Sequence, residues 1–143
     1  MPYRYLEDIG TADIAFEATG RDLPELFRSA ADAVVNVMID NLDAIERRET
    51  QRIELSGDDL EMLLFDFLQE LIYLKDADRL LLRVGDAQIQ ERNAKYLLQA
   101  TAAGERVDPE RHNQRADVKA VTLHGFCVEE QDGGWKARVL LDI

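Results

Sequence analysis

Apolar residues recur at helical spacing over residues 56–75, SGDDLEMLLFDFLQELIYLK. Successive members lie three or four residues apart, the period of an amphipathic helix: Leu60, Leu63, Leu64, Phe67, Leu68, Leu71 and Ile72. Further apolar residues widen this stripe beyond half of the helix circumference, so other elements must cover much of it. We expect Ser56 to cap the N-terminus, with Asp59 in the first turn. Polar residues interrupt the stripe, which is too short to span a bilayer, so the pattern predicts a core helix.

A second helix is predicted to begin at Asp22. Asp22 is a suitable N-cap, and Glu25 three residues later completes a capping box. The apolar stripe that follows reaches Met38, and its alanines would allow close packing against a neighbour. We expect this helix to end near Asp40.

Alternation of apolar and polar residues predicts strands elsewhere in the chain. They are expected at 3–6, 14–18, 51–55, 80–84, 87–91, 95–102, 117–129 and 135–143, with a tight turn at 131–134. We interpret residues 104–114 as a mobile loop that anchors no core. The pattern predicts an α+β fold with one domain over residues 1–143. In it, a largely antiparallel, or mixed, sheet of about seven or eight strands packs against two helices.

Charge narrows the range of partners. Asp and Glu number 29 against 17 Lys and Arg, which gives a net charge of −12. Such a surface repels phosphate backbones, so we expect protein or metal partners and no tight direct binding of nucleic acid. The single cysteine, Cys127, excludes an intrachain disulfide and fits a reducing compartment. The N-terminus has no apolar signal region, so we expect a cytoplasmic protein that does not bind membranes.

Few residues are candidates for chemistry. The sequence contains no motif of a nucleophilic enzyme, and two histidines and one cysteine are too few for a zinc site. We interpret His124 as packed or hydrogen-bonded, and His112 as solvated. Asp13 precedes a strand, and Asp142 ends the last strand beside the terminal carboxylate of Ile143. Oxygen ligands of this kind suit Ca²⁺, Mg²⁺ or Mn²⁺, although an aspartate at either place is also an ordinary turn cap or solvated residue.

The sequence resembles the archease family from end to end. The matching stretches are Tyr5-Leu6 with Thr11-Ala12-Asp13, the alanine-rich helix 26–38, Gly57-Asp58-Asp59-Leu60, residues 118–122 (VKAVT) and residues 137–143 (ARVLLDI). The resemblance implies a non-catalytic protein cofactor of the RtcB-type RNA ligase, which speeds guanylylation of the ligase and supports its multiple turnover. That ligase joins a 2′,3′-cyclic phosphate or 3′-phosphate end to a 5′-hydroxyl in tRNA splicing and RNA repair. The ligase requires GTP and Mn²⁺, and its reaction passes through a guanylylated histidine.

Carried over from the family, the ligands of a divalent cation are Asp13, Asp142 and Ile143. Ca²⁺ is the first expectation, with Mg²⁺ or Mn²⁺ as alternatives. Folding must therefore bring residue 13 to the end of the chain. Asp8 is a further candidate oxygen ligand. Lys119 is either an ion-pair partner of the carboxylates or a contact to the ligase.

The loop before Asp13 departs from the family pattern. The family reads Asp-His-Thr-Ala-Asp or a close variant, whereas this chain has a longer loop with Gly10 where histidine is expected. Any role of that histidine is not carried over. Two other functions stay open: a stand-alone metal-dependent hydrolase that uses Asp13 and Asp142, and a general chaperone or assembly factor.

Overall fold

The computed structural model describes residues 2–6 and 13–143. These residues form two α-helices, one short 3-10 helix and seven strands. The strands are β1 (Tyr3–Tyr5), β2 (Asp13–Gly20), β3 (Glu49–Gly57), β4 (Leu80–Arg92), β5 (Lys95–Arg106), β6 (Ala120–Gln131) and β7 (Gly134–Asp142). The helices are α1 (Leu23–Met38) and α2 (Leu60–Asp78), and the 3-10 helix η1 covers Leu42–Ala44.

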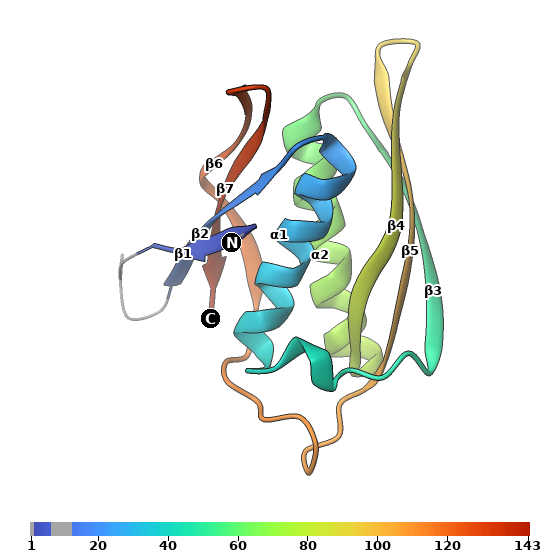
Figure 1. The fold of residues 1–143 in the computed structure, drawn as a ribbon, viewed down its shortest axis with the longest axis vertical. Helices are drawn as coiled ribbons and strands as arrows, with labels where there is room; N and C mark the ends of the chain where they lie inside the picture. Colours follow the sequence, from blue (N-terminus) through green and yellow to red (C-terminus); the bar gives the residue numbers. More distant parts are fainter. Residues whose placement is uncertain (1, 7–12) are drawn as a thin grey trace.

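The strands form two antiparallel sheets with the helices between them. One sheet has the order β1-β2-β7-β6 and the other has the order β3-β5-β4. Both helices contact both sheets, as the three layers in Figure 1 show. The expected α+β fold is confirmed, with the strands divided between two sheets rather than gathered in one.

The two helices supply much of the core. Leu64, Phe67 and Leu68 of α2 are fully buried, as are Leu26 and Phe27 of α1. Each such side chain contributes about 1.5–3 kcal/mol when it leaves water. Because the helices lie between two sheets, the wide apolar stripe of α2 finds cover on several sides. None of the helices that the structure describes is both long enough and apolar enough to cross a membrane.

An aspartate caps the N-terminus of each α-helix. The Asp22 carboxylate accepts a hydrogen bond of 2.9 Å from the Glu25 amide, as predicted for α1. The Glu25 carboxylate accepts from the Arg21 amide instead of the cap residue, so the capping box is only half formed. The prediction of Ser56 as the cap of α2 was wrong. Ser56 lies in β3, and the Asp59 carboxylate accepts from the Met62 amide at 2.7 Å.

Two strand predictions were also wrong. The predicted strands 80–84 and 87–91 are one strand, β4, whose register against β5 shifts between Val84 and Asp86. Gly85 is the extra residue at this bulge and has no partner in the register, but the strand continues through it. The turn to β5 uses Asn93 and Ala94 at φ of 53° and 62°. The Gln131–Gly134 turn between β6 and β7 is confirmed, with Asp132 and Gly133 at positive φ.

The prediction of a mobile loop over 104–114 that anchors no core was wrong. Gly104 to Arg106 complete β5, and Val107 is buried. His112, predicted to be solvated, is 1 % exposed. The segment after β5 crosses from one sheet to the other beneath the helices (Figure 1).

Candidate functional site

Asp13 and Asp142 are direct neighbours across two strands. β2 pairs with β7 in antiparallel register from Asp13 opposite Asp142 to Gly20 opposite Trp135. Residues directly opposite in such a pair project from the same face, with Cβ atoms about 4.5–5.5 Å apart. The next pair, Ile14 and Leu141, belongs to the core that the sheet forms with the helices. Since successive side chains alternate, the two aspartates project to the outer face of the sheet.

Neither carboxylate forms an ion pair with a described residue. Both residues are partly exposed. Among residues 2–6 and 13–143, no Lys, Arg or His lies within 4.0 Å of either carboxylate as an ion pair. Like charges directly opposite destabilise a strand pair. A divalent cation would relieve this repulsion, and Ile143, next in the chain, offers a main-chain oxygen.

The donor set fits a hard cation. Two carboxylates and a main-chain oxygen are all oxygen ligands, which Ca²⁺, Mg²⁺ and Mn²⁺ prefer. In the described part of the chain, no group of three or more His, Cys, Asp or Glu side chains could hold a metal. Asp8, the further ligand candidate, lies outside the described residues, as does Gly10.

The backbone of Lys119 contacts the candidate site. Its amide donates to the Asp142 carbonyl at 2.8 Å, and the next residue, Ala120, is opposite Asp142 in the β6–β7 register. The Lys119 side chain is exposed and forms no ion pair with any described residue. Lys119 was predicted either to pair with the carboxylates or to contact the ligase. The structure shows no such ion pair among the described residues, and the contact to the ligase stays a prediction.

A hollow of about 190 Å³ adjoins Asp13. Tyr5, Val37 and Arg115 also line it. The Arg115 guanidinium donates to the Asn36 carbonyl at 3.1 Å. Burial raises the pKa of Tyr5, so its hydroxyl stays protonated and donates to the Ala33 carbonyl at 2.7 Å. Arg115 was not predicted at this site, because it is distant from Asp13 in the sequence and only the fold brings the two together.

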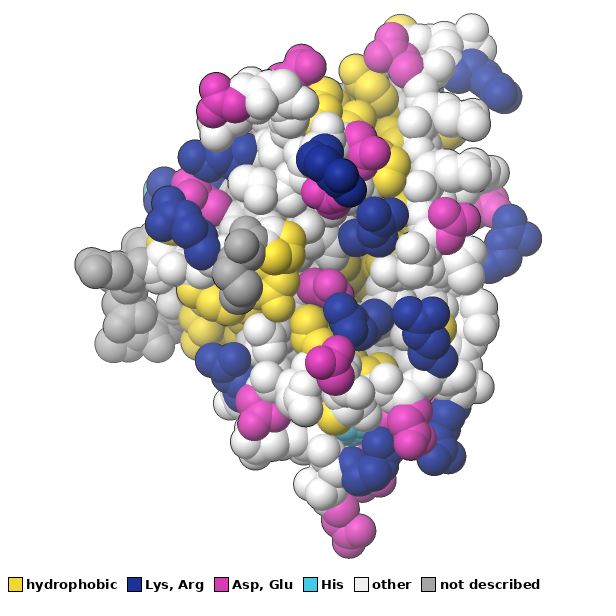
Figure 2. All heavy atoms as spheres, viewed as in Figure 1, with side chains coloured by type: hydrophobic (Ala, Val, Ile, Leu, Met, Phe, Trp, Pro, Cys, Tyr) yellow, Lys and Arg dark blue, Asp and Glu magenta, His cyan; other side chains and the backbone are white. Residues whose placement is uncertain are grey.

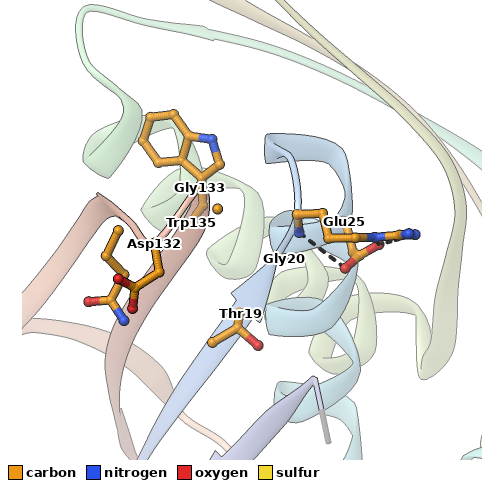
Figure 3. A pocket seen from close by; sticks show the side chains of 9 residues that line it. Thr19, Gly20, Glu25, Asp132, Gly133 and Trp135 are labelled. Carbon is orange, nitrogen blue, oxygen red and sulfur yellow. Dashed lines mark hydrogen bonds and ion pairs between the residues drawn. The ribbon is translucent and has the colours of Figure 1, made fainter.

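A larger hollow, about 330 Å³, lies at the other end of the same strand pair (Figure 3). Thr19, Gly20 and Trp135 line it, and Arg21 contributes its guanidinium. That guanidinium is already paired with Glu25 at 3.0 Å. The hollow contains neither candidate carboxylate, so it is separate from the Asp13–Asp142 site.

A buried ionic cluster lies around Glu105. Its carboxylate is hydrogen-bonded by the Arg111 guanidinium, by the Glu46 amide at 2.7 Å, and by His112 Nε2 at 2.9 Å. The Asp108 amide donates to His112 Nδ1 at 2.8 Å, so Nδ1 carries no proton and Nε2 donates to Glu105. Burial alone raises the pKa of Glu105, but these hydrogen bonds outweigh it and lower the pKa to about 2. The cluster anchors the crossing segment and has a structural role.

His124 lies in β6 as predicted, and its side chain is exposed. Only its backbone amide makes a described hydrogen bond, to the Thr122 hydroxyl at 3.3 Å. The interpretation of a packed or hydrogen-bonded imidazole was therefore wrong.

Known proteins are similar to this chain in sequence and in fold. The archease protein family (MTH1598/TM1083) matches residues 3–143. The Pyrococcus abyssi protein archease is 38 % identical over 134 residues, covering 93 % of this chain and 94 % of the relative. The Methanosarcina mazei protein archease is 39 % identical over 142 residues, covering 99 % and 95 %.

Two solved structures also match. The solution structure of Methanobacterium thermoautotrophicum protein 1598 has a TM-score of 0.86 and 37 % identity, with 99 % of each chain covered. A Thermotoga maritima archease described as a possible chaperone has a TM-score of 0.59 at 20 % identity, covering 94 % of this chain and 93 % of the other, and shares the fold. Sequence and structure together show that this chain belongs to the archease family.

Proposed function

We propose that this chain is a non-catalytic activator of an RtcB-type RNA ligase and that it acts through a cation held by Asp13, Asp142 and Ile143. Family membership supports the role. The observation that carries the site is the register of β2 and β7, which sets two carboxylates side by side on one sheet face. Ca²⁺ is the first candidate, with Mg²⁺ and Mn²⁺ as alternatives.

In this proposal the chain holds a cation and docks on the ligase, and it carries out no bond-forming step itself. The carboxylates hold the cation at the end of a rigid strand pair, and the acidic molecule approaches a basic ligase cleft by electrostatic attraction. Lys119, whose amide donates to the Asp142 carbonyl and whose side chain is exposed, would contact the ligase in this proposal. The cytoplasmic setting and the role in tRNA splicing and RNA repair are part of the same proposal.

Transfer of GMP from GTP to the purified ligase tests this function. We expect the wild-type chain to accelerate the transfer, and Asp13→Ala and Asp142→Ala to lose most of that acceleration. Unchanged guanylylation on adding the wild type would reject the activator role. Full activity of both variants would reject the role of the cation site.

A second candidate is a general chaperone, since the Thermotoga maritima relative is described as a possible chaperone. Equal protection of several unrelated aggregating proteins, with no effect on the ligase, would favour it. A stand-alone metal-dependent hydrolase has less support. The described residues around Asp13 and Asp142 include no histidine or third acidic side chain to act as a general base.

A further inference from the structure

The exposed side of α2 and the adjoining part of β6 carry large apolar side chains in contact with solvent. Tyr73 is 62 % exposed, Leu123 is 60 % exposed and Met62 is 37 % exposed. Phe65 and Phe126 are partly buried beside them, with ring centroids 5.7 Å apart in an edge-to-face arrangement. Met62, Phe65, Tyr73, Leu123 and Phe126 are called here the α2–β6 face.

Three contacts align β6 with the helix. The Gln69 side chain accepts from the Val121 amide at 2.8 Å, and the Glu61 carboxylate accepts from the Val128 amide at 3.1 Å. With the Phe65–Phe126 contact between them, residues 121–128 run antiparallel to α2. Leu123 therefore lies beside the helical turn from Phe65 to Gln69, and Tyr73 continues the same helix face one turn further.

The backbone of β6 favours a partner that contacts the side chains of this face over one that adds a strand to the sheet. The register of β6 against β7 shifts between Thr122 and Cys127, and Gly125 in that segment has a φ of 67°. The strand thus departs from regular pairing where Leu123 is exposed. Side chains of α2 already occupy the amides of Val121 and Val128, so a partner strand could not pair with β6 through these groups.

Acidic side chains lie along the face, and one basic residue, the exposed Arg138, lies beside Gly125. Asp66 and Glu70 lie on the non-buried side of α2, and Glu130 lies further along β6. Within the described residues, none of these three pairs with a Lys or Arg. Figure 2 shows many Lys and Arg side chains among the acidic ones on the side of the molecule where α1 lies in front of α2.

The face also adjoins the candidate cation site. Ala120 is opposite Asp142 in the sheet, and Val121, which follows it, is bonded to Gln69 of α2. Adjacent strands are about 4.8 Å apart, so one strand spacing separates the Asp142 backbone from β6, the strand that carries Leu123 and Phe126.

From this placement we infer that the α2–β6 face binds a protein surface on the ligase that presents Lys and Arg side chains around an apolar centre. The inference depends on the proposed function, because it names the docking surface of that activator. The acidic rim favours a basic protein and disfavours nucleic acid, an anionic membrane or a second copy of the same chain. Exposed Tyr73 and Leu123 would become the buried anchors of the interface.

Titration calorimetry with the purified ligase and the full chain tests the inference. One variant is Tyr73→Ser/Leu123→Ser, and a second, chemically different one is Asp66→Lys/Glu70→Lys. The matched control, Asp86→Lys/Glu110→Lys, reverses two exposed acids outside the face. We expect each face variant to raise the Kd for the ligase by about ten-fold or more, and the control to leave it within about two-fold.

The outcomes separate this inference from the function on which it depends. All substituted residues are exposed or partly exposed, and thermal unfolding of each variant would verify the fold. Wild-type binding with an unchanged Kd for both face variants would overturn the docking surface and leave the activator role standing. No wild-type binding or activation would overturn both. A wild-type dimer that the Tyr73→Ser/Leu123→Ser variant abolishes would assign the face to self-association and overturn the inference.

Discussion

At the scale of single residues, Asp13 and Asp142 form a pair of like charges directly opposite one another in the sheet. The two side chains are opposite one another with no ion-paired base among the described residues. Their repulsion costs about 0.2–1 kcal/mol when no cation is bound. If the proposed cation site is correct, stability should rise when a divalent cation binds, and substitution of either aspartate should abolish that rise.

Asp142→Asn tests this dependence. In chelator, we expect the variant to be as stable as the wild type or up to about 1 kcal/mol more stable, because the repulsion is gone. With saturating Ca²⁺, the wild type should gain stability and the variant should not. Thermal unfolding with and without Ca²⁺ measures both effects. A wild type insensitive to Ca²⁺, Mg²⁺ and Mn²⁺ would contradict the cation site.

Glu105 gives the fold a separate dependence on pH. Its pKa in the folded state is lowered from 4.5 to about 2, chiefly by Arg111, the Glu46 amide and His112 acting against burial. The ionised form therefore stabilises the protein fully above pH 4.5, and this contribution is lost as the pH falls toward 2.

Glu105→Gln should accordingly unfold at lower denaturant concentration at pH 7 and show a flatter decline in stability below pH 4.5. Urea titrations from pH 7 to pH 3 measure this. Asp86→Asn, at an exposed acid on β4, serves as the control. A Glu105→Gln variant that keeps the full acid sensitivity of the wild type would show that other carboxylates are responsible.

At the scale of the elements, the approach of β5 to β4 depends on a glycine. A Cβ added at Gly104 would lie 1.8 Å from the Leu81 carbonyl oxygen, whereas one added at Gly85 would meet only the Thr101 oxygen, at 3.9 Å. Gly104→Ala should therefore cost more than about 2 kcal/mol, and Gly85→Ala should stay within about 0.5 kcal/mol. Urea unfolding of both variants compares them directly. Equal stabilities of the Gly104→Ala and Gly85→Ala variants would contradict this, because β4 and β5 would then accommodate the added methyl group at no cost in free energy.

Local patterns predicted most of the elements. The i, i+3, i+4 stripe of α2, the Asp22 cap of α1 and the turn at 131–134 are short-range signals, and the structure has all three. The start of α2 was misplaced because Ser56 and Asp59 are both good caps, and the extension of β3 to Gly57 decides between them. The joining of two predicted strands into β4 depends on pairing with β5, which no local pattern contains.

The prediction of a mobile loop over residues 104–114 was wrong for a related reason. Glu105, Arg111 and His112 are polar, and polar residues predict exposure unless their partners are known. They satisfy each other only when the chain folds back on itself. By contrast, family resemblance suggested Asp13 and Asp142 together, and the β2–β7 register places them side by side.

At the scale of the whole molecule, the net charge of −12 should govern association with a basic partner. Opposite charges attract over about 10 Å at 0.1 M salt and over less at higher ionic strength. We expect the association rate with the ligase to fall by about ten-fold between low and high salt, with a smaller change in the dissociation rate. Stopped-flow mixing at several NaCl concentrations measures both rates. An association rate independent of salt would contradict electrostatic approach.

The most direct test of the account is the number of ligations per ligase molecule when this chain is present in catalytic amount. With the wild-type chain, we predict repeated turnover of RNA carrying 2′,3′-cyclic phosphate and 5′-hydroxyl ends. With Asp13→Asn or Asp142→Asn, turnover should stop near one product per ligase. A ligase that stops at a single turnover with the wild-type chain, or turns over equally well with both variants, would contradict the central claim.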